Sequence, residues 1–321
     1  MCYIELMSYN CVVILGPTAV GKTAVGVSVA HHFGGEVISA DSRQTYKGLD
    51  IGSGKDLCEY QIDGIPVPYH LIDITTLETE YNVFNYQTDF YQVFEEIRGR
   101  GKLTVVVGGT GMYLDSVIRG YDLITVPENV ELHESLEKRE LSDLAKELLS
   151  LKPDLHNKSD LLEKDRVIKA LEIALFEQSE EGKSARESLK RPDIRPLVIG
   201  TTLERSQVVA NIERRLKERL DEGMIEEVQG LHNAGASWER LEKLGLEYRY
   251  CSLFLEGKIA TKEELFEKLF IQIRQFSKRQ MTWYRGMEKK GVKINWLTET
   301  PDKKKRIDEA IKLIETEGVE W

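Results

Sequence analysis

Short runs of aliphatic, mostly β-branched residues alternate with longer helical stretches in the first third of the chain. Three such runs are followed by glycine or aspartate and predict buried strands, at residues 11–15, 36–40 and 103–107. The stretches between these runs predict helices, at residues 24–32 and 84–98. Alternation of strands and helices is typical of a parallel sheet covered by helices, so we expect an α/β fold.

The pattern changes after Asp122. Residues 127–176 are charged, rich in leucine and poor in β-branched residues, which predicts several helices in an insertion. Further along, the pattern predicts a strand at 195–201, helices from Glu204 to Trp283, a strand at 292–297 and a helix at 301–317. We therefore expect three parts: an α/β core at 1–122, a helical insertion at 123–176, and a return to the core with a helix-rich C-terminal region at 177–321.

The 321 residues carry a formal net charge of −10. This acidic balance argues against a protein coated in basic charge, although it is compatible with a local basic groove. The cysteines form no C-x-x-C pair, so we expect neither a disulfide framework nor a zinc site at Cys2, Cys11, Cys58 and Cys251. The N-terminus does not read as a signal peptide, and no apolar run approaches the roughly 20 residues of a membrane span. We expect a cytoplasmic monomer that makes no contact with membrane.

One motif indicates a specific chemistry. Residues 16–23 fit the phosphate-binding pattern G-x-x-x-x-G-K-[ST], and they stand between a predicted strand and a predicted helix. The motif consists of Gly16, Pro17, Thr18, Ala19, Val20, Gly21, Lys22 and Thr23. Its glycines let several backbone N–H groups face one anion, and the following helix adds the positive end of its dipole. Lys22 would reach the outer phosphate oxygens, and Thr23 would offer a hydroxyl to Mg²⁺. The sequence therefore predicts a P-loop-type parallel sheet flanked by helices.

The acidic residue expected in a nucleotide hydrolase is absent. In such enzymes an aspartate at the end of a further apolar strand helps to hold Mg²⁺, whereas the run at 103–107 is followed by Gly108-Gly109-Thr110-Gly111. A carboxylate stands instead at Asp41, after the second strand, on the sheet edge where ligands bind. Asp41 could orient Mg²⁺ or accept a proton, or it could simply cap a turn with Ser42.

The segment at 273–292 is basic. It contains six cationic residues and one acidic residue, Glu288. Some of the cationic residues recur at helical spacing, with Trp283 and Tyr284 between them. Such a helix either contacts phosphates with aromatic support or presents an ordinary solvated face, and the pattern alone favours the second interpretation. The run at 214–219 is balanced by glutamates and is interpreted as a surface helix.

Six segments, in the same order, resemble the tRNA dimethylallyltransferase family, whose members prenylate an adenosine next to the anticodon. They are GPTAVGKT at 16–23, ISADSRQTYKGLDIGSGK at 38–55, PYHLID at 68–73, VVVGGTGMYL at 105–114, DRVIKALEI at 165–173 and IRQFSKRQMTWYR at 273–285. The first segment is common among P-loop proteins. The second and the last are far more specific to the family.

The resemblance implies a role for each matched position. Asp41 would be the general base for the adenine N6 amine, Thr110 would line the reaction channel, and dimethylallyl diphosphate would be held by Lys22, Thr23 and Arg274, with Mg²⁺ on Thr23. The insertion would grip the anticodon stem-loop of tRNA. The tRNA-contacting residues would be Asp41, Ser42, Arg43, Gln44, Arg166, Lys278, Arg279, Gln280 and Arg285.

One segment departs from the family's pattern. Where the family usually has G-Y-[KR]-[EQ], this chain has Glu247-Tyr248-Arg249-Tyr250, so the glycine and the final Glu or Gln are absent. The resemblance places this segment near bound RNA, so we expect the consequence in tRNA recognition.

Three functions are compatible with these features. A tRNA prenyltransferase accounts for the insertion and for the basic C-terminal segment. A prenyltransferase of free adenine nucleotides would use the same donor site without an RNA-binding insertion, and the altered segment at 247–250 keeps it open. A nucleotide kinase or P-loop switch protein would have a carboxylate where Gly108 stands, and it ranks third.

Overall fold

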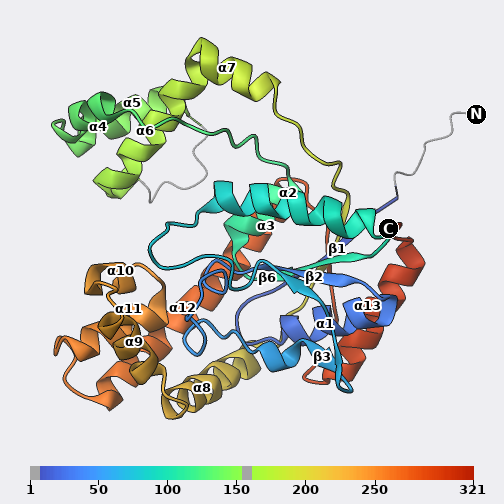
Figure 1. Ribbon diagram of the computed structural model, residues 1–321. Helices are drawn as coiled ribbons and strands as arrows, with labels where there is room; N and C mark the ends of the chain where they lie inside the picture. The colour runs from blue at the N-terminus through green and yellow to red at the C-terminus, as the bar shows by residue number, and fades with distance from the viewer. Residues whose placement is uncertain (1–7, 154–160) are drawn as a thin grey trace, which may run out of the picture. The chain divides into compact units, whose positions relative to one another are not determined.

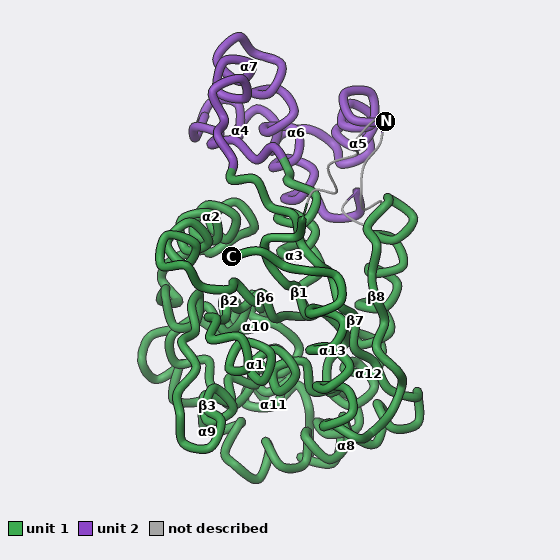
Figure 2. The backbone as a smooth tube through the Cα atoms, turned by 90° about the vertical axis from the view of Figure 1, so that its right-hand side faces the viewer, with its two compact units in different colours: residues 1–121, 192–321 green, residues 122–191 purple. Residues whose placement is uncertain are grey.

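The computed structural model describes residues 8–153 and 161–321, so the predictions for Cys2 and for part of the insertion lie outside the described residues. The chain forms two compact units, one from residues 1–121 and 192–321 and the other from residues 122–191 (Figure 2). The second unit thus ends later than the predicted 176. The reason is that α7 (Glu180–Glu187) follows α6 (Lys164–Gln178) almost directly and packs against it.

The first unit is built on a six-stranded sheet with the order β5-β2-β6-β1-β7-β8, in which every neighbouring pair is parallel. The α/β fold is therefore confirmed. The strands are β1 (Cys11–Leu15), β2 (Glu36–Ala40), β5 (Tyr69–His70), β6 (Thr104–Gly108), β7 (Pro196–Gly200) and β8 (Ile294–Trp296). The sequence pattern misses β5 because two residues are too short to show a period.

Helices cover both faces of this sheet (Figure 1). One face packs against α1 (Lys22–Phe33) and α13 (Lys303–Glu317), and the other against α2 (Val83–Gly99), α3 (Gly111–Ile118) and the end of α12 (Lys262–Lys289). Along β1, Val12 and Ile14 belong to the first core, whereas Val13 and Leu15 belong to the second. Burial on both faces explains why this strand is a continuous apolar run.

A further apolar core lies between α12 and four shorter helices and includes Ala19 and Val20 of the P-loop. The helices are α8 (Arg205–Asp221), α9 (Met224–Asn233), α10 (Trp238–Glu242) and α11 (Leu246–Leu255). The short η1 (Leu57–Glu59) and the hairpin of β3 (Gln61–Ile62) and β4 (Ile65–Pro66) complete the unit. The P-loop is therefore anchored by its own side chains in a helical layer beside the sheet.

The second unit has its own small core, formed by α4 (Val130–Glu137), α5 (Leu141–Leu151) and α6. Leu144 and Leu148 of α5 are one turn apart and share a core with Val167 and Leu171 of α6. Across the described part of the chain, no helix is both long and apolar enough to traverse a bilayer.

Candidate active site

Three parallel strands end at the same level of the sheet. Gly108 at the end of β6 is paired with Leu15 of β1 on one side and with Ala40 of β2 on the other. The P-loop, Asp41 and Gly109 therefore emerge from one sheet edge, with β6 between the other two strands. This is the edge at which open α/β sheets bind their ligands.

The P-loop adopts a tight turn at this edge. Gly21 has φ 78° and forms the N-cap of α1, and Ala19 has φ 64°, a left-handed value that is uncommon for a residue with a side chain. A Cβ on Gly16 would lie 2.1 Å from the carbonyl oxygen of Thr201, so this glycine is required by a close backbone approach. The N-terminus of α1 thus faces the open edge as an anion site.

Side chains from distant helices brace the P-loop. Gln280 of α12 accepts a hydrogen bond from the Thr18 N–H (2.8 Å) and donates one to the Gly109 carbonyl (2.9 Å). Asn211 of α8 donates to the Ala19 carbonyl at 2.9 Å. Buried Arg306 of α13 donates to the Val20 carbonyl and to the Thr201 hydroxyl. Sequence patterns do not reveal Asn211 or Arg306, because each lies far along the chain from the loop it supports.

Lys22 folds back over the loop, where its ammonium donates to the Pro17 carbonyl at 2.7 Å. Burial lowers the pKa of Lys22 to about 8, and Asp41 partly opposes this by favouring the charged form. The structure thus places the amine and the Asp41 carboxylate within electrostatic reach of each other, as the motif and the sheet topology predict.

Asp41 begins the turn that follows β2. Its carboxylate accepts the Arg43 N–H at 2.9 Å, so the turn-capping role considered for this residue is present. The Ser42 N–H donates to the Thr110 hydroxyl at 3.1 Å, and the Thr110 N–H donates to the Ala40 carbonyl at 3.1 Å. Asp41 and Thr110 are therefore held on adjacent turns across β2 and β6.

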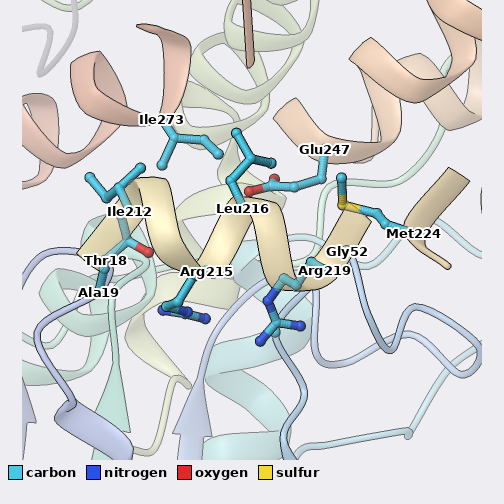
Figure 3. A pocket seen from close by; sticks show the side chains of 11 residues that line it. Thr18, Ala19, Gly52, Ile212, Arg215, Leu216, Arg219, Met224, Glu247 and Ile273 are labelled. Carbon is cyan, nitrogen blue, oxygen red and sulfur yellow. The ribbon is translucent and has the colours of Figure 1, made fainter. Parts of the chain in front are cut away.

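A pocket lies beside the P-loop, against α8 (Figure 3). Thr18 and Ala19 form one wall, and Figure 3 shows Arg215 and Arg219 of α8 reaching into the same space. The interpretation of 214–219 as a surface helix is therefore wrong for these two arginines. Arg215 and Arg219 are one helical turn apart, next to the buried stripe of Val208, Ile212 and Leu216, and this spacing could have identified them.

The two arginines differ in their partners. Arg219 donates to the Ile51 carbonyl and to the Asp56 carboxylate, the latter at 2.8 and 3.1 Å. Arg215 forms neither an ion pair nor a hydrogen bond with another described residue, and burial lowers the pKa of its guanidinium. A desolvated cation beside an anion-binding loop, with no hydrogen bond or ion pair to any described residue, is suited to hold a phosphate oxygen.

The other predicted cations are distributed differently. Arg274 is half-buried on α12, stacked over the Phe270 ring at 5.3 Å, and its Nε has no partner among the described residues. Lys278, Arg279 and Arg285 are exposed on the same helix. Arg166 belongs to the second unit, where it pairs with Glu163 at 3.0 Å. Gln280 is instead buried as the brace described above, and Ser42, Arg43 and Gln44 lie on the turn after Asp41.

The altered segment lies at the pocket rather than on an exposed face. Glu247 lines the pocket together with Arg215, and burial raises the pKa of its carboxyl. Tyr248 is fully buried and donates to Glu227 of α9 at 2.8 Å. Among the four residues only Arg249 is exposed, and only Glu247 lines this pocket, so the expected consequence for tRNA recognition stays a prediction.

Thr23 is the one predicted metal-binding residue. It lies in the first turn of α1 and is half-buried. In the described ranges no three His, Cys, Asp or Glu side chains are grouped so that they could hold a metal. A hydroxyl at the end of an anion site fits Mg²⁺, which keeps several waters and takes its remaining ligands from a bound phosphate chain.

Comparisons with known proteins point to one family. A family model described as IPP transferase matches residues 44–287, and one described as isopentenyl transferase matches residues 9–64. The chain is 52% identical to tRNA dimethylallyltransferase 2 of Treponema denticola, over 90% of this chain and 96% of that protein. It is 49% identical to tRNA dimethylallyltransferase 1 of Syntrophus aciditrophicus, over 91% and 94% of the two chains.

Solved structures show the same fold. The full-length tRNA isopentenylpyrophosphate transferase of Bacillus halodurans matches with a TM-score of 0.68 and 31% identity, covering 96% of each chain. A eukaryotic dimethylallyltransferase that acts on tRNA matches with a TM-score of 0.75 and 21% identity, covering 98% of this chain and 81% of that one. The second likeness concerns the fold alone.

Proposed function

Because the chain belongs to the tRNA dimethylallyltransferase family, we propose that it transfers a dimethylallyl group from dimethylallyl diphosphate to the N6 amine of the adenosine next to the anticodon of tRNA. Diphosphate is released. The observation that carries the proposal is that the P-loop and the Asp41 carboxylate emerge from one sheet edge, and that Arg215, which has no ion-pair partner in the described ranges, lines a pocket with the P-loop. This edge therefore carries both an anion site for the donor and a carboxylate that can accept a proton.

The reaction forms a bond between N6 and C1 of the donor while the C1–O bond breaks. The electron pair of that bond leaves with the diphosphate, whose charge Lys22, Arg215 and the P-loop N–H groups would stabilise together with Arg274, as the family resemblance implies. Asp41 accepts the proton that N6 loses, since an aryl amine is too weakly acidic to lose it unaided. The target adenine must leave its stack to reach a donor in this pocket.

Mg²⁺ would be held by the Thr23 hydroxyl and the donor's own oxygens, and when bound it neutralises charge on the leaving diphosphate. The exposed cations of α12 would contact the RNA backbone, and Arg166 with the rest of the second unit would contact the anticodon stem-loop. We propose that the enzyme is a monomer and that it acts in the cytoplasm, where its tRNA substrate is found.

A transfer assay with radiolabelled dimethylallyl diphosphate tests the function. We expect label in unmodified tRNA, and no label when the base next to the anticodon is not adenine. AMP serves as the alternative acceptor in a parallel reaction. Label in AMP but not in tRNA would assign the chain to the free-nucleotide prenyltransferases, and label in neither would exclude the proposed reaction.

The donor's kcat/KM is expected to fall as the pH rises through about 8, because the Lys22 ammonium loses its proton there. The sign follows from the lowered pKa, since the charged form that binds phosphate is present below it and absent above it. The decline approaches about tenfold per pH unit if only the cation binds. The pH profile of donor kcat/KM measures it.

Lys22→Arg is the control for this profile, because a guanidinium keeps its charge throughout the range. We expect its alkaline decline to vanish even if its overall rate is lower. A decline at the same pH in Lys22→Arg would assign the titration to another group.

A further inference from the structure

The loop at 50–56 is bound by a single carboxylate at its start. Glu227 of α9 accepts hydrogen bonds from three consecutive backbone N–H groups, those of Asp50 (3.1 Å), Ile51 (2.6 Å) and Gly52 (3.1 Å). Its carboxylate also accepts the Tyr248 hydroxyl at 2.8 Å. Four donors on one carboxylate form a charge-assisted cluster that fixes where the loop begins.

The same loop is packed closely against the neighbouring helices. A Cβ on Gly52 would lie 2.8 Å from the ring of Tyr248, so the backbone of the loop rests directly on α11. Arg219 links the two ends of the loop, because its guanidinium donates to the Ile51 carbonyl near the start and to the Asp56 carboxylate at the end. The loop thus takes up hydrogen-bond donors of Arg219 that would otherwise be available in the pocket.

Arg215 lies against the middle of this loop. A Cβ on Gly54 would lie 3.0 Å from a terminal guanidinium nitrogen of Arg215 and 3.4 Å from one of Arg219. Gly52, Gly54 and both arginines line the pocket together with Thr18 of the P-loop. The backbone of the loop at Gly54 therefore bounds the space in which the Arg215 guanidinium lies beside the P-loop.

We propose that Glu227 is a positioning residue that sets Arg215 against the donor's diphosphate by clamping the loop at 50–56. Glu227 does not line the pocket, so it acts through the loop and not on the donor itself. The segment at 247–250 takes part through Tyr248, which donates to the clamp. The inference rests on the proposed function for the identity of the donor.

Glu227→Gln tests the clamp, because the amide keeps the size of the side chain but loses the charge and one acceptor. We expect the KM for dimethylallyl diphosphate to rise by roughly tenfold to a hundredfold, while the KM for tRNA stays within about threefold. Glu226→Gln is the matched control, since it removes the same charge from the next residue of α9, whose side chain is exposed. This control should leave both KM values unchanged.

A double-mutant cycle separates positioning from a general structural role. If Glu227 acts through Arg215, then Glu227→Gln should change the donor KM by less than about threefold once Arg215→Ala is present. If the two substitutions raise the donor KM by factors that simply multiply in the double variant, the inference is overturned. Equal increases in the KM values for donor and tRNA would overturn it as well. Tyr248→Phe offers a milder variant if Glu227→Gln does not fold, with an expected rise in donor KM of roughly twofold to tenfold.

Binding of inorganic diphosphate, measured by calorimetry in the presence of Mg²⁺, gives a readout that does not depend on transfer. We expect weaker binding in Glu227→Gln, and no further weakening by that change when Arg215 is already alanine. Unchanged diphosphate binding in Glu227→Gln would overturn the inference whatever the acceptor is. Absence of prenyl transfer to tRNA by the unaltered enzyme would instead contradict the proposed function.

Discussion

Asp41→Asn is expected to slow prenyl transfer by roughly 10²- to 10⁴-fold, the range for loss of a general base. Asparagine has the same shape, and its carbonyl oxygen can still accept the Arg43 N–H that the carboxylate accepts at 2.9 Å. The turn after β2 should therefore persist, and only the capacity to take a proton is lost. The single-turnover rate with saturating donor and tRNA measures the effect.

Binding of the donor supplies the internal control for Asp41→Asn, and it should not weaken. Asp63→Asn is the matched variant, because Asp63 is an exposed aspartate in the turn between β3 and β4. An unchanged single-turnover rate would remove Asp41 from the proton-accepting role and leave it as a turn cap. Thermal melting of the variant shows whether a large rate loss comes from unfolding.

Arg215→Ala is expected to lower the donor's kcat/KM by roughly 10²- to 10³-fold, as removal of one preorganised donor to a developing anion does. The guanidinium lines the pocket with Thr18 and has no partner within the described chain, so its interaction is available to the diphosphate. Little stability should be lost, because no hydrogen bond between Arg215 and another described residue is broken. Steady-state kinetics with varied donor measure the change.

Arg214→Ala is the matched control for Arg215→Ala. It removes an arginine from the neighbouring position of α8, where the side chain is exposed and paired with Glu218 at 2.8 Å. Surface pairs of this kind contribute at most about 1 kcal/mol, so the control should keep its activity. Equal losses in the two variants would mean that the charge of the helix matters and not the placement of Arg215. Arg274→Ala then shows how much of the diphosphate's stabilisation comes from α12.

The RNA side of the site stays a prediction. Lys278, Arg279 and Arg285 are exposed, whereas Arg274, which recurs with Lys278 and Arg285 at helical spacing, is half-buried. Gln280, which the resemblance groups with them, is 7% exposed and holds the Thr18 N–H. One helix therefore turns one face to the P-loop and another to solvent.

The sequence by itself determined the strands of the core, the P-loop and the position of Asp41. Each depends on neighbouring residues, because a buried strand must be apolar along its length and a phosphate loop needs its glycines and lysine at fixed spacing. The order of these segments also indicated that their ends would meet at one sheet edge. Short elements such as β5 escaped detection because two residues carry no periodicity.

Only the tertiary structure decided which distant side chains complete the site. Arg215, Asn211 and Arg306 lie about 190 to 290 residues from the P-loop that they flank or brace, and a basic helix has the same composition whether its arginines meet solvent or a pocket. Packing of α8 through Ile212 and Leu216 selects the face that turns inward. The physical reason is that burial and partner choice depend on contacts between elements, which no local pattern contains.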